Sequence, residues 1–159
     1  FEIANLDGRR LVAADEFFIG PMLTSVMPGD CLSAVRFPVL SGGRVGTGFH
    51  EVSARQSDFA FVAAAAQIVL DEDGRCVDAL LGLGGVGDLP QRIDVSALIG
   101  EDVSRVSIGD LVASTTEQLD ANSDLHASRD YRRRVAAALG TRALEDAFAE
   151  ARLQEQAVQ

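Results

Sequence analysis

The chain has 159 residues, a formal net charge of −10 at pH 7 and a hydrophobic content of 47%. This length and apolar content are enough for one globular domain, alone or with a piece of another, whose core needs no disulfides. The basic residues are all arginine, which excludes a P-loop lysine and a Schiff-base lysine. The acidic balance argues against nucleic-acid binding, and no apolar run approaches the roughly 18 residues of a membrane helix.

The two cysteines, Cys31 and Cys76, are far apart in the sequence and form no metal-type pair. We therefore expect no metal site, free thiols and a cytoplasmic protein. The chain opens on Phe1 rather than Met, and no signal sequence precedes it. We expect a cut or a domain boundary there, with more of the protein upstream.

The first forty residues are typical of short strands and turns. Asp7-Gly8 predicts a hairpin within residues 1–13, Asp15 is expected to cap a short turn, and Cys31–Phe37 is predicted to be a strand. Four glycines in Ser41–Gly48 predict a flexible loop, and the following segment to Gln56 is expected to be irregular. This loop separates two predicted domains, 1–40 and 41–159.

A hairpin of two long apolar strands is predicted next. Phe59–Leu70 contains an alanine run that would suit a helix by propensity. The turn chemistry of Asp71–Gly74 and the second apolar run that follows favour strands, although buried strands and helices look alike in short apolar runs.

The remainder of the chain is predicted to be mainly helical. Asp94 is expected to cap a short helical turn closed by Gly100, and a helix is expected over 108–119. A long helix is predicted over 127–157, with Ser128 as its cap and Gly140 as a kink or division. Its expected buried face consists of Val135, Leu139, Ala143, Leu144 and Phe148. Strands followed by helices predict an α+β fold.

The glycine run Gly82–Gly87 fits the dinucleotide fingerprint G-x-G-x-x-G. A dinucleotide site also needs a helix that starts at the last glycine, and the Asp-Leu-Pro sequence that follows should be extended. We therefore interpret the glycines as a close-packed strand end. If a small nucleotide-binding protein were correct instead, Gly84→Ala would abolish nucleotide affinity without unfolding. We expect that substitution to destabilise, because the added methyl group has no room.

Other polar residues give no self-contained active site. His50 is expected in the glycine-rich loop, where a ligand contact and simple solvation are equally acceptable. His126 is expected to cap or pack at a helix start. Asp71–Asp73 is interpreted as a solvated turn. The cluster Arg132–Arg134 lies unfavourably for the helix dipole, so it is expected to pair with acids elsewhere, a partner subunit included.

Several motifs together resemble a known family. In order along the chain they are RLVAADEFFIGP at 10–21, Thr24, PGDCL at 28–32, FHEVSARQSDFA at 49–60, Asp73-Gly74, GGV at 84–86 with Pro90 and Arg92, and DLHASRDYRR at 124–133. Their order and spacing resemble the flavin (medium) subunits of molybdenum hydroxylases, the family of carbon monoxide dehydrogenase and xanthine dehydrogenase.

The resemblance implies an organisation and a function. Residues 1–40 would end an FAD-binding domain, and 41–159 would form an α+β C-terminal domain with a small antiparallel sheet of about three to four strands against about three helices. The subunit would form one wall of the FAD pocket in electron transfer from iron–sulfur clusters to an acceptor. The implied partners are the upstream FAD-binding region of the same subunit and separate molybdopterin and iron–sulfur subunits.

The resemblance also implies site residues. Asp30, Cys31 and Leu32 match the segment that lines the flavin, and His50 falls where relatives such as xanthine dehydrogenase have a lysine near the isoalloxazine. A histidine could stabilise an anionic reduced flavin only when protonated. Arg55 and Asp58 match a recurrent Arg…Asp pattern, interpreted as structural support that could contact the flavin.

One departure from the family limits these expectations. The glycine-rich loops that hold the FAD pyrophosphate lie upstream of residue 1 in the family, and nothing in this sequence replaces them. We therefore expect the chain alone to bind FAD weakly or not at all, and we assign it no catalytic residue. The alternative is a non-catalytic interaction module that keeps the fold without flavin.

Overall fold

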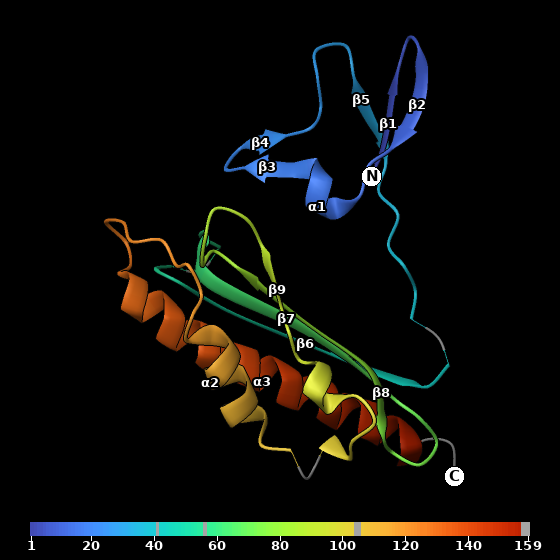
Figure 1. Ribbon diagram of the computed structural model, residues 1–159, viewed down its shortest axis with the longest axis vertical. Coiled ribbons are helices and arrows are strands. Elements are labelled where there is room, and N and C mark those ends of the chain that lie inside the picture. The colour runs from blue at the N-terminus through green and yellow to red at the C-terminus, as the bar shows by residue number, and fades with distance from the viewer. Residues whose placement is uncertain (41, 56, 104–105, 157–159) are drawn as a thin grey trace. The chain divides into compact units, whose positions relative to one another are not determined.

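A computed structural model describes residues 1–40, 42–55, 57–103 and 106–156. The chain divides into two compact units, Phe1–Val39 and Leu40–Gln159, which are described separately (Figure 1). The predicted segment boundaries at Ser41, Gln56 and Ala157 lie outside the described residues.

The first unit is built from five short strands and one helical turn. Strands β1 (Glu2–Asn5), β2 (Gly8–Leu11) and β5 (Cys31–Ala34) form an antiparallel sheet in the order β2-β1-β5. Helix α1 (Ala14–Phe17) leads into the hairpin of β3 (Phe18–Gly20) and β4 (Leu23–Thr24).

Local chemistry explains most of the first unit. The predicted hairpin forms because the side chain of Asn5 accepts from the backbone N–H groups of Asp7 and Gly8. The prediction that Asp15 caps the turn was wrong, because Ala13 precedes α1 without a side-chain cap and Asp15 lies inside its first turn.

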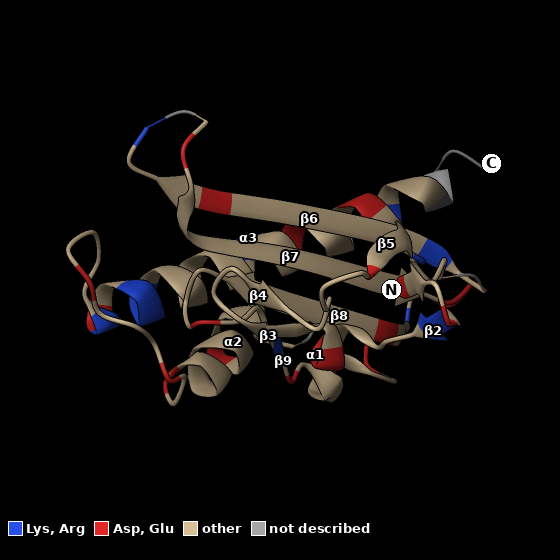
Figure 2. Cartoon of the chain, turned by 90° about the horizontal axis from the view of Figure 1, so that it is seen from above, with Lys and Arg blue, Asp and Glu red and all other residues tan. Residues whose placement is uncertain are grey.

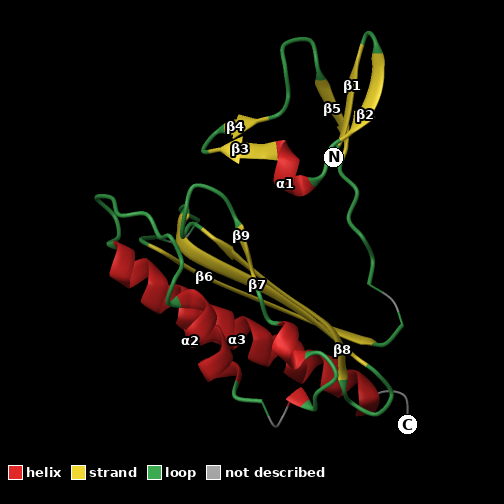
Figure 3. Cartoon of the chain, viewed as in Figure 1, coloured by secondary structure: helices red, strands yellow, loops and turns green. Residues whose placement is uncertain are grey.

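The second unit contains a four-stranded antiparallel sheet in the order β6-β7-β8-β9 (Figure 3). Its strands are β6 (Arg44–Ser53), β7 (Ala60–Leu70), β8 (Cys76–Gly84) and β9 (Gln91–Ile93). The alanine run is a strand, as predicted. The Asp71 carboxylate accepts from the backbone N–H of Arg75 at 2.8 Å, which closes the turn between β7 and β8.

Strand β6 corrects the sequence interpretation of residues 41–56 as a glycine loop and an irregular segment. Gly46 and Gly48 lie inside β6, opposite Ile68 and Ala66 of β7. Their missing side chains let helix α3 approach the sheet, because a methyl group at either position would overlap a backbone carbonyl of that helix, that of Ala147 or Ala143.

The helices follow the sheet in sequence. They are the 3₁₀ turn η1 (Ser96–Leu98), α2 (Ile108–Thr116) and α3 (Arg129–Gln156). Ser128 accepts from the backbone N–H of Tyr131 at the start of α3, which confirms its predicted role. The prediction that Asp94 is the cap of the short turn was wrong by one position, because Val95 precedes η1 without a side-chain cap, although Asp94 accepts from the backbone N–H of Ser96. Helix α3 lies along one face of the sheet, and α2 packs against it (Figure 1).

Gly140 does not divide α3, which is one helix through Gln156. A methyl group there would lie 3.1 Å from Val112 Cγ1 of α2 and 3.3 Å from Leu81 Cδ2 of β8, so this glycine provides close packing. The main core lies between the helical layer and one face of the sheet, which confirms the α+β prediction. Its fully buried large side chains include Ile68, Leu70, Leu81, Leu83, Leu98, Val103, Val112 and Leu144.

Candidate functional site

Asp30, the first predicted flavin-side residue, is the anchor of a turn in the first unit. Its carboxylate accepts from the backbone N–H of Met27 at 3.1 Å, from Arg10 at 2.7 Å and from Asn5 at 3.0 Å. These donors, the backbone N–H of Met27 foremost, lower the pKa of Asp30. Its side chain is only 5% exposed, so both oxygens are engaged within the unit.

Cys31 and Leu32 follow on β5, which is an edge strand of the three-stranded sheet. Cys31 is an exposed free thiol, and Leu32 is 43% exposed although its backbone is paired with that of Ile3. These two residues therefore present an accessible, partly apolar strand edge.

His50 lies on strand β6 of the second unit and not in a loop. Its Nε2 is 2.8 Å from Asp146 Oδ2 of α3, and its side chain is about one-third exposed. Register places His50 opposite the buried Ala64, so it shares the helix-covered face of the sheet. The structure joins His50 to an acid that sequence reasoning missed, because the two residues are 96 positions apart.

The loop between β6 and β7 contains the predicted Arg…Asp pair. Arg55 and Asp58 form an ion pair at 3.2 Å, and the Asp58 carboxylate also accepts from the backbone N–H of Phe59. Arg55 is 83% exposed at its side chain and Phe59 is 93% exposed. The pair therefore links Arg55 to Asp58 next to an accessible aromatic ring.

The glycine fingerprint forms a strand end, and no helix follows it, as expected. Gly85 has φ +73°, and a methyl group there would lie 2.7 Å from the carbonyl oxygen of Phe61. The expectation that Gly84 has no room was wrong. A methyl group at Gly84 would lie 3.9 Å from Ala63 Cβ, an ordinary contact distance. The tight position is the next residue along the chain.

The arginine cluster at the start of α3 is shown in blue in Figure 2. Arg132 is buried, and its guanidinium donates to the carbonyls of Phe61 and Gly85 and to Asp124 at 2.7 Å. The acid expected elsewhere is therefore in the same chain. Arg132 precedes Ala136 by four residues and Leu139 by seven, and this helical spacing could have predicted its buried position.

Asp124 is the acidic partner in this arrangement. Backbone N–H groups of Ala127 and His126, together with Arg132, lower the pKa of Asp124 to about 2. His126 stacks on Phe61 with ring centroids 5.9 Å apart, which confirms its predicted packing role.

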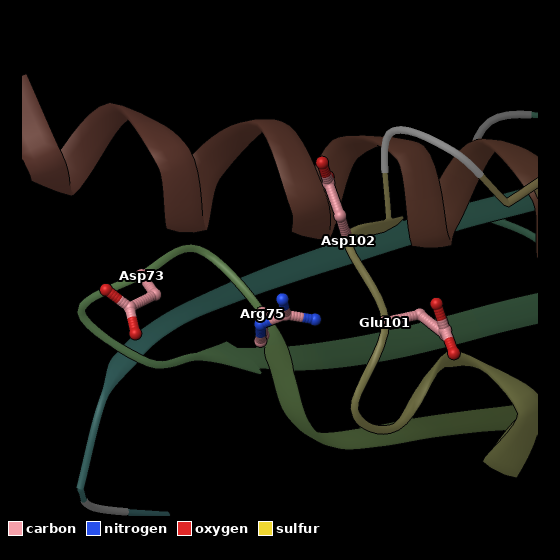
Figure 4. A pocket seen from close by; sticks show the side chains of 4 residues that line it. All are labelled: Asp73, Arg75, Glu101 and Asp102. Carbon is pink, nitrogen blue, oxygen red and sulfur yellow. The ribbon is translucent and has the colours of Figure 1, made fainter.

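Two surface hollows lie in the second unit. One, of about 470 Å³, lies on the sheet and is lined by Thr47, Gly48, Phe49, Ala65, Ala66, Gln67 and Leu80. The other, of about 290 Å³, is polar and is lined by Asp73, Arg75, Glu101 and Asp102 (Figure 4).

Within the described residues, no group of three or more His, Cys, Asp or Glu side chains is arranged to hold a metal. No helix in the described part of the chain is long and apolar enough to cross a membrane.

Comparisons with known proteins give a consistent result. The model of the CO dehydrogenase flavoprotein C-terminal domain matches residues 47–147. The carbon monoxide dehydrogenase medium chain of Afipia carboxidovorans is 30% identical over 154 residues, which are 96% of this chain and 53% of that protein.

Solved structures share the fold. Quinoline 2-oxidoreductase from Pseudomonas putida 86 matches with a TM-score of 0.83 and 31% identity, over 94% of this chain and 52% of that one. A cyanide-inactivated Cu,Mo-CO dehydrogenase matches with a TM-score of 0.82 and 28% identity, over the same shares. The chain therefore spans about half the length of these relatives. The match over residues 47–147, across most of the second unit, shows that the chain belongs to the CO dehydrogenase flavoprotein C-terminal domain family.

Proposed function

We propose that this chain is the C-terminal part of the flavin subunit of a molybdenum-containing hydroxylase or dehydrogenase. In the complete subunit it forms one wall of the FAD pocket, in electron transfer from iron–sulfur clusters to an acceptor. The observation that carries the proposal is the family match over residues 47–147, together with similarity along nearly the whole chain to a medium chain about twice as long.

We further propose Asp30, Cys31, Leu32 and His50 as FAD-binding residues of the complete subunit. FAD, when bound, supplies the redox chemistry, and the protein supplies contacts and charge. The exposed edge at Cys31 and Leu32 fits a contact with a flat heterocycle. Asp30 supports this strand from the preceding turn, since its carboxylate is already engaged by donors of its own unit.

His50 is proposed to act as a positioned polar group near the flavin. Asp146 accepts a hydrogen bond from Nε2 when that nitrogen carries a proton, and this contact fixes the orientation of the ring. His50 can stabilise negative charge on a neighbouring group only as the imidazolium.

The pyrophosphate of FAD has no evident cradle in the described residues. The glycine run Gly82–Gly87 resembles such a loop, but Gly85 in it is already engaged by the protein. Its carbonyl accepts a hydrogen bond from Arg132, and its Cα packs closely against the carbonyl of Phe61. We therefore propose that the pyrophosphate is held by an upstream FAD-binding region of the same subunit. Molybdopterin and iron–sulfur subunits are proposed as the further partners, in the cytoplasm.

Flavin retention tests this proposal. The 159-residue chain, incubated with FAD and desalted, should retain no stoichiometric flavin absorbance, whereas the complete subunit should retain it. In the complete subunit, Leu32→Asp should weaken FAD binding about tenfold, because an exposed contact leucine becomes charged. Leu6→Asp is the matched control, since Leu6 is fully exposed at a hairpin turn of the same unit.

The outcomes separate the alternatives. Stoichiometric flavin on the chain alone would contradict the division of the site. If the complete subunit binds no flavin, the alternative of a non-catalytic interaction module would be supported instead. Equal loss of FAD in both leucine variants would remove Leu32 from the flavin side.

A further inference from the structure

Strand β6 is an edge strand of the four-stranded sheet, and part of its outward edge is occupied by side chains of α3. Glu150 Oε2 accepts from the backbone N–H of Thr47 at 2.6 Å and from its hydroxyl at 2.9 Å. Gln154 Nε2 donates to the backbone carbonyl of Val45 at 2.8 Å. Both backbone groups point away from β7, because they belong to alternate residues of the strand and are bonded from outside the sheet.

The two side chains together imitate one residue of an additional strand. In a parallel ladder, a residue of the added strand donates to the carbonyl of residue i−1 and accepts from the amide of residue i+1. Gln154 and Glu150 supply this donor and this acceptor to Val45 and Thr47. They lie one helical turn apart on α3, so a regular helix places them at the correct spacing along the edge.

The edge would otherwise favour pairing with another strand. β6 is ten residues long and contains no proline and no lysine, two residues that commonly protect edge strands. Phe49 is 61% exposed on the same strand and lines the apolar hollow of the adjoining sheet face. Two-fold related copies of one chain pair their edge strands antiparallel, and such pairing needs the outward amide and carbonyl groups that α3 occupies.

We propose that Glu150 and Gln154 act as an edge guard that prevents β6 from pairing with β6 of a second copy of the chain. The guard is independent of flavin binding. The pKa of Glu150 is lowered because Thr47 donates two hydrogen bonds to its carboxylate, which agrees with an ionised, engaged acceptor.

Sedimentation velocity of the 159-residue chain tests the guard. The double variant Glu150→Ala/Gln154→Ala should self-associate about tenfold more tightly than the wild type, because two backbone groups of the edge become available. Glu145→Ala is the matched control, since Glu145 is an exposed acid on the same helix. Glu150→Gln should stay near the wild type, because the amide oxygen still accepts from Thr47.

A further substitution locates the association on β6. Thr47→Pro removes the outward N–H at an edge position where proline is tolerated, and it should abolish association of the double variant. Two results would overturn the proposal. One is that the double variant still associates when Thr47→Pro is added. The other is that the double variant associates no more tightly than Glu145→Ala.

Amide hydrogen exchange gives a second measurement if the double variant folds poorly. In Glu150→Ala alone, exchange of the Thr47 amide should accelerate about tenfold, whereas Glu145→Ala should leave it unchanged. An unchanged Thr47 rate in Glu150→Ala would show that Glu150 does not occupy the edge in solution.

Discussion

Arg132 shows how one residue can join several segments of this fold. Its guanidinium bonds Phe61 on β7, Gly85 after β8 and Asp124 in the loop before α3, while its side chain is 6% exposed. A buried charge is stable only when it is paired and hydrogen-bonded. Two backbone carbonyls and one carboxylate accept from the terminal nitrogens of Arg132, whereas its buried Nε has no hydrogen-bond partner among the described residues. The start of α3 is thereby fixed to the end of the central hairpin.

Replacing Arg132 should be costly. Arg132→Met keeps the apolar stem, removes the donor of two partly buried carbonyls and takes one of three donors from the Asp124 carboxylate, so we expect a loss of about 3 kcal/mol in the free energy of unfolding. Urea denaturation followed by circular dichroism measures it. Arg142→Met, at an exposed position of the same helix, should change the unfolding free energy by less than about 0.5 kcal/mol. Equal effects of the two substitutions would refute the role of Arg132.

At the scale of the element, α3 packs against the sheet along a path made of small residues. Gly46 and Gly48 on β6 face Ala147 and Ala143 on α3, and the side chains involved are absent or single methyl groups. Small residues on both elements let the backbones approach, and Asp146 and Glu150 then reach His50 and Thr47. The close packing of the helix thus places both of these polar contacts.

Adding one methyl group should separate these elements. Gly48→Ala is expected to lower the free energy of unfolding by about 2 kcal/mol, because the new Cβ overlaps the backbone carbonyl of Ala143 and neither backbone can yield locally. Gly84→Ala is the matched control on β8, where the methyl group has room. It should be neutral or stabilise by up to about 1 kcal/mol, since alanine restricts the unfolded chain. Thermal unfolding compares the two, and a greater loss for Gly84→Ala would reject this account.

At the scale of the whole molecule, acidic residues outnumber basic ones by 24 to 14, yet many acids are engaged. Hydrogen bonds lower the pKa of several carboxyl groups, and each such group is ionised in the folded state. The groups with lowered pKa values are Glu2, Asp30, Asp94, Asp124 and Glu150. Folding therefore favours ionised carboxylates at these positions.

Stability should consequently fall in acid. A carboxyl group with a depressed pKa in the folded state contributes stability above its unfolded pKa, and this contribution disappears as pH falls through the folded pKa. For Asp124 the window extends from 3.8 down to about 2. We expect the urea midpoint to decrease between about pH 4.5 and 2, and Asp124→Asn to make that decrease shallower. A midpoint that is constant over this range, or a variant with an unchanged slope, would contradict the expectation.

Elements that arise from local causes could be predicted from the amino-acid sequence. Each of these features depends on residues within a few positions of each other. They are the turn at Asp71–Gly74, the hydrogen bonds of Asp94 and Ser128 at helix starts, and the apolar period of α3. Motif order along the whole chain also identified the family, which the match over residues 47–147 confirms.

Features that depend on contacts between residues distant in sequence could not be predicted and are visible only in the folded chain. A glycine-rich segment became strand β6 because α3, about 100 residues later, packs where its side chains are missing. His50 is bonded to Asp146, which is 96 positions away in the sequence, and Thr47 to Glu150, which is 103 positions away. Arg132 donates to Phe61, which is 71 positions away. Local propensity carries no information about such pairs, since the backbone approach that creates them exists only once the sheet and the helix have packed.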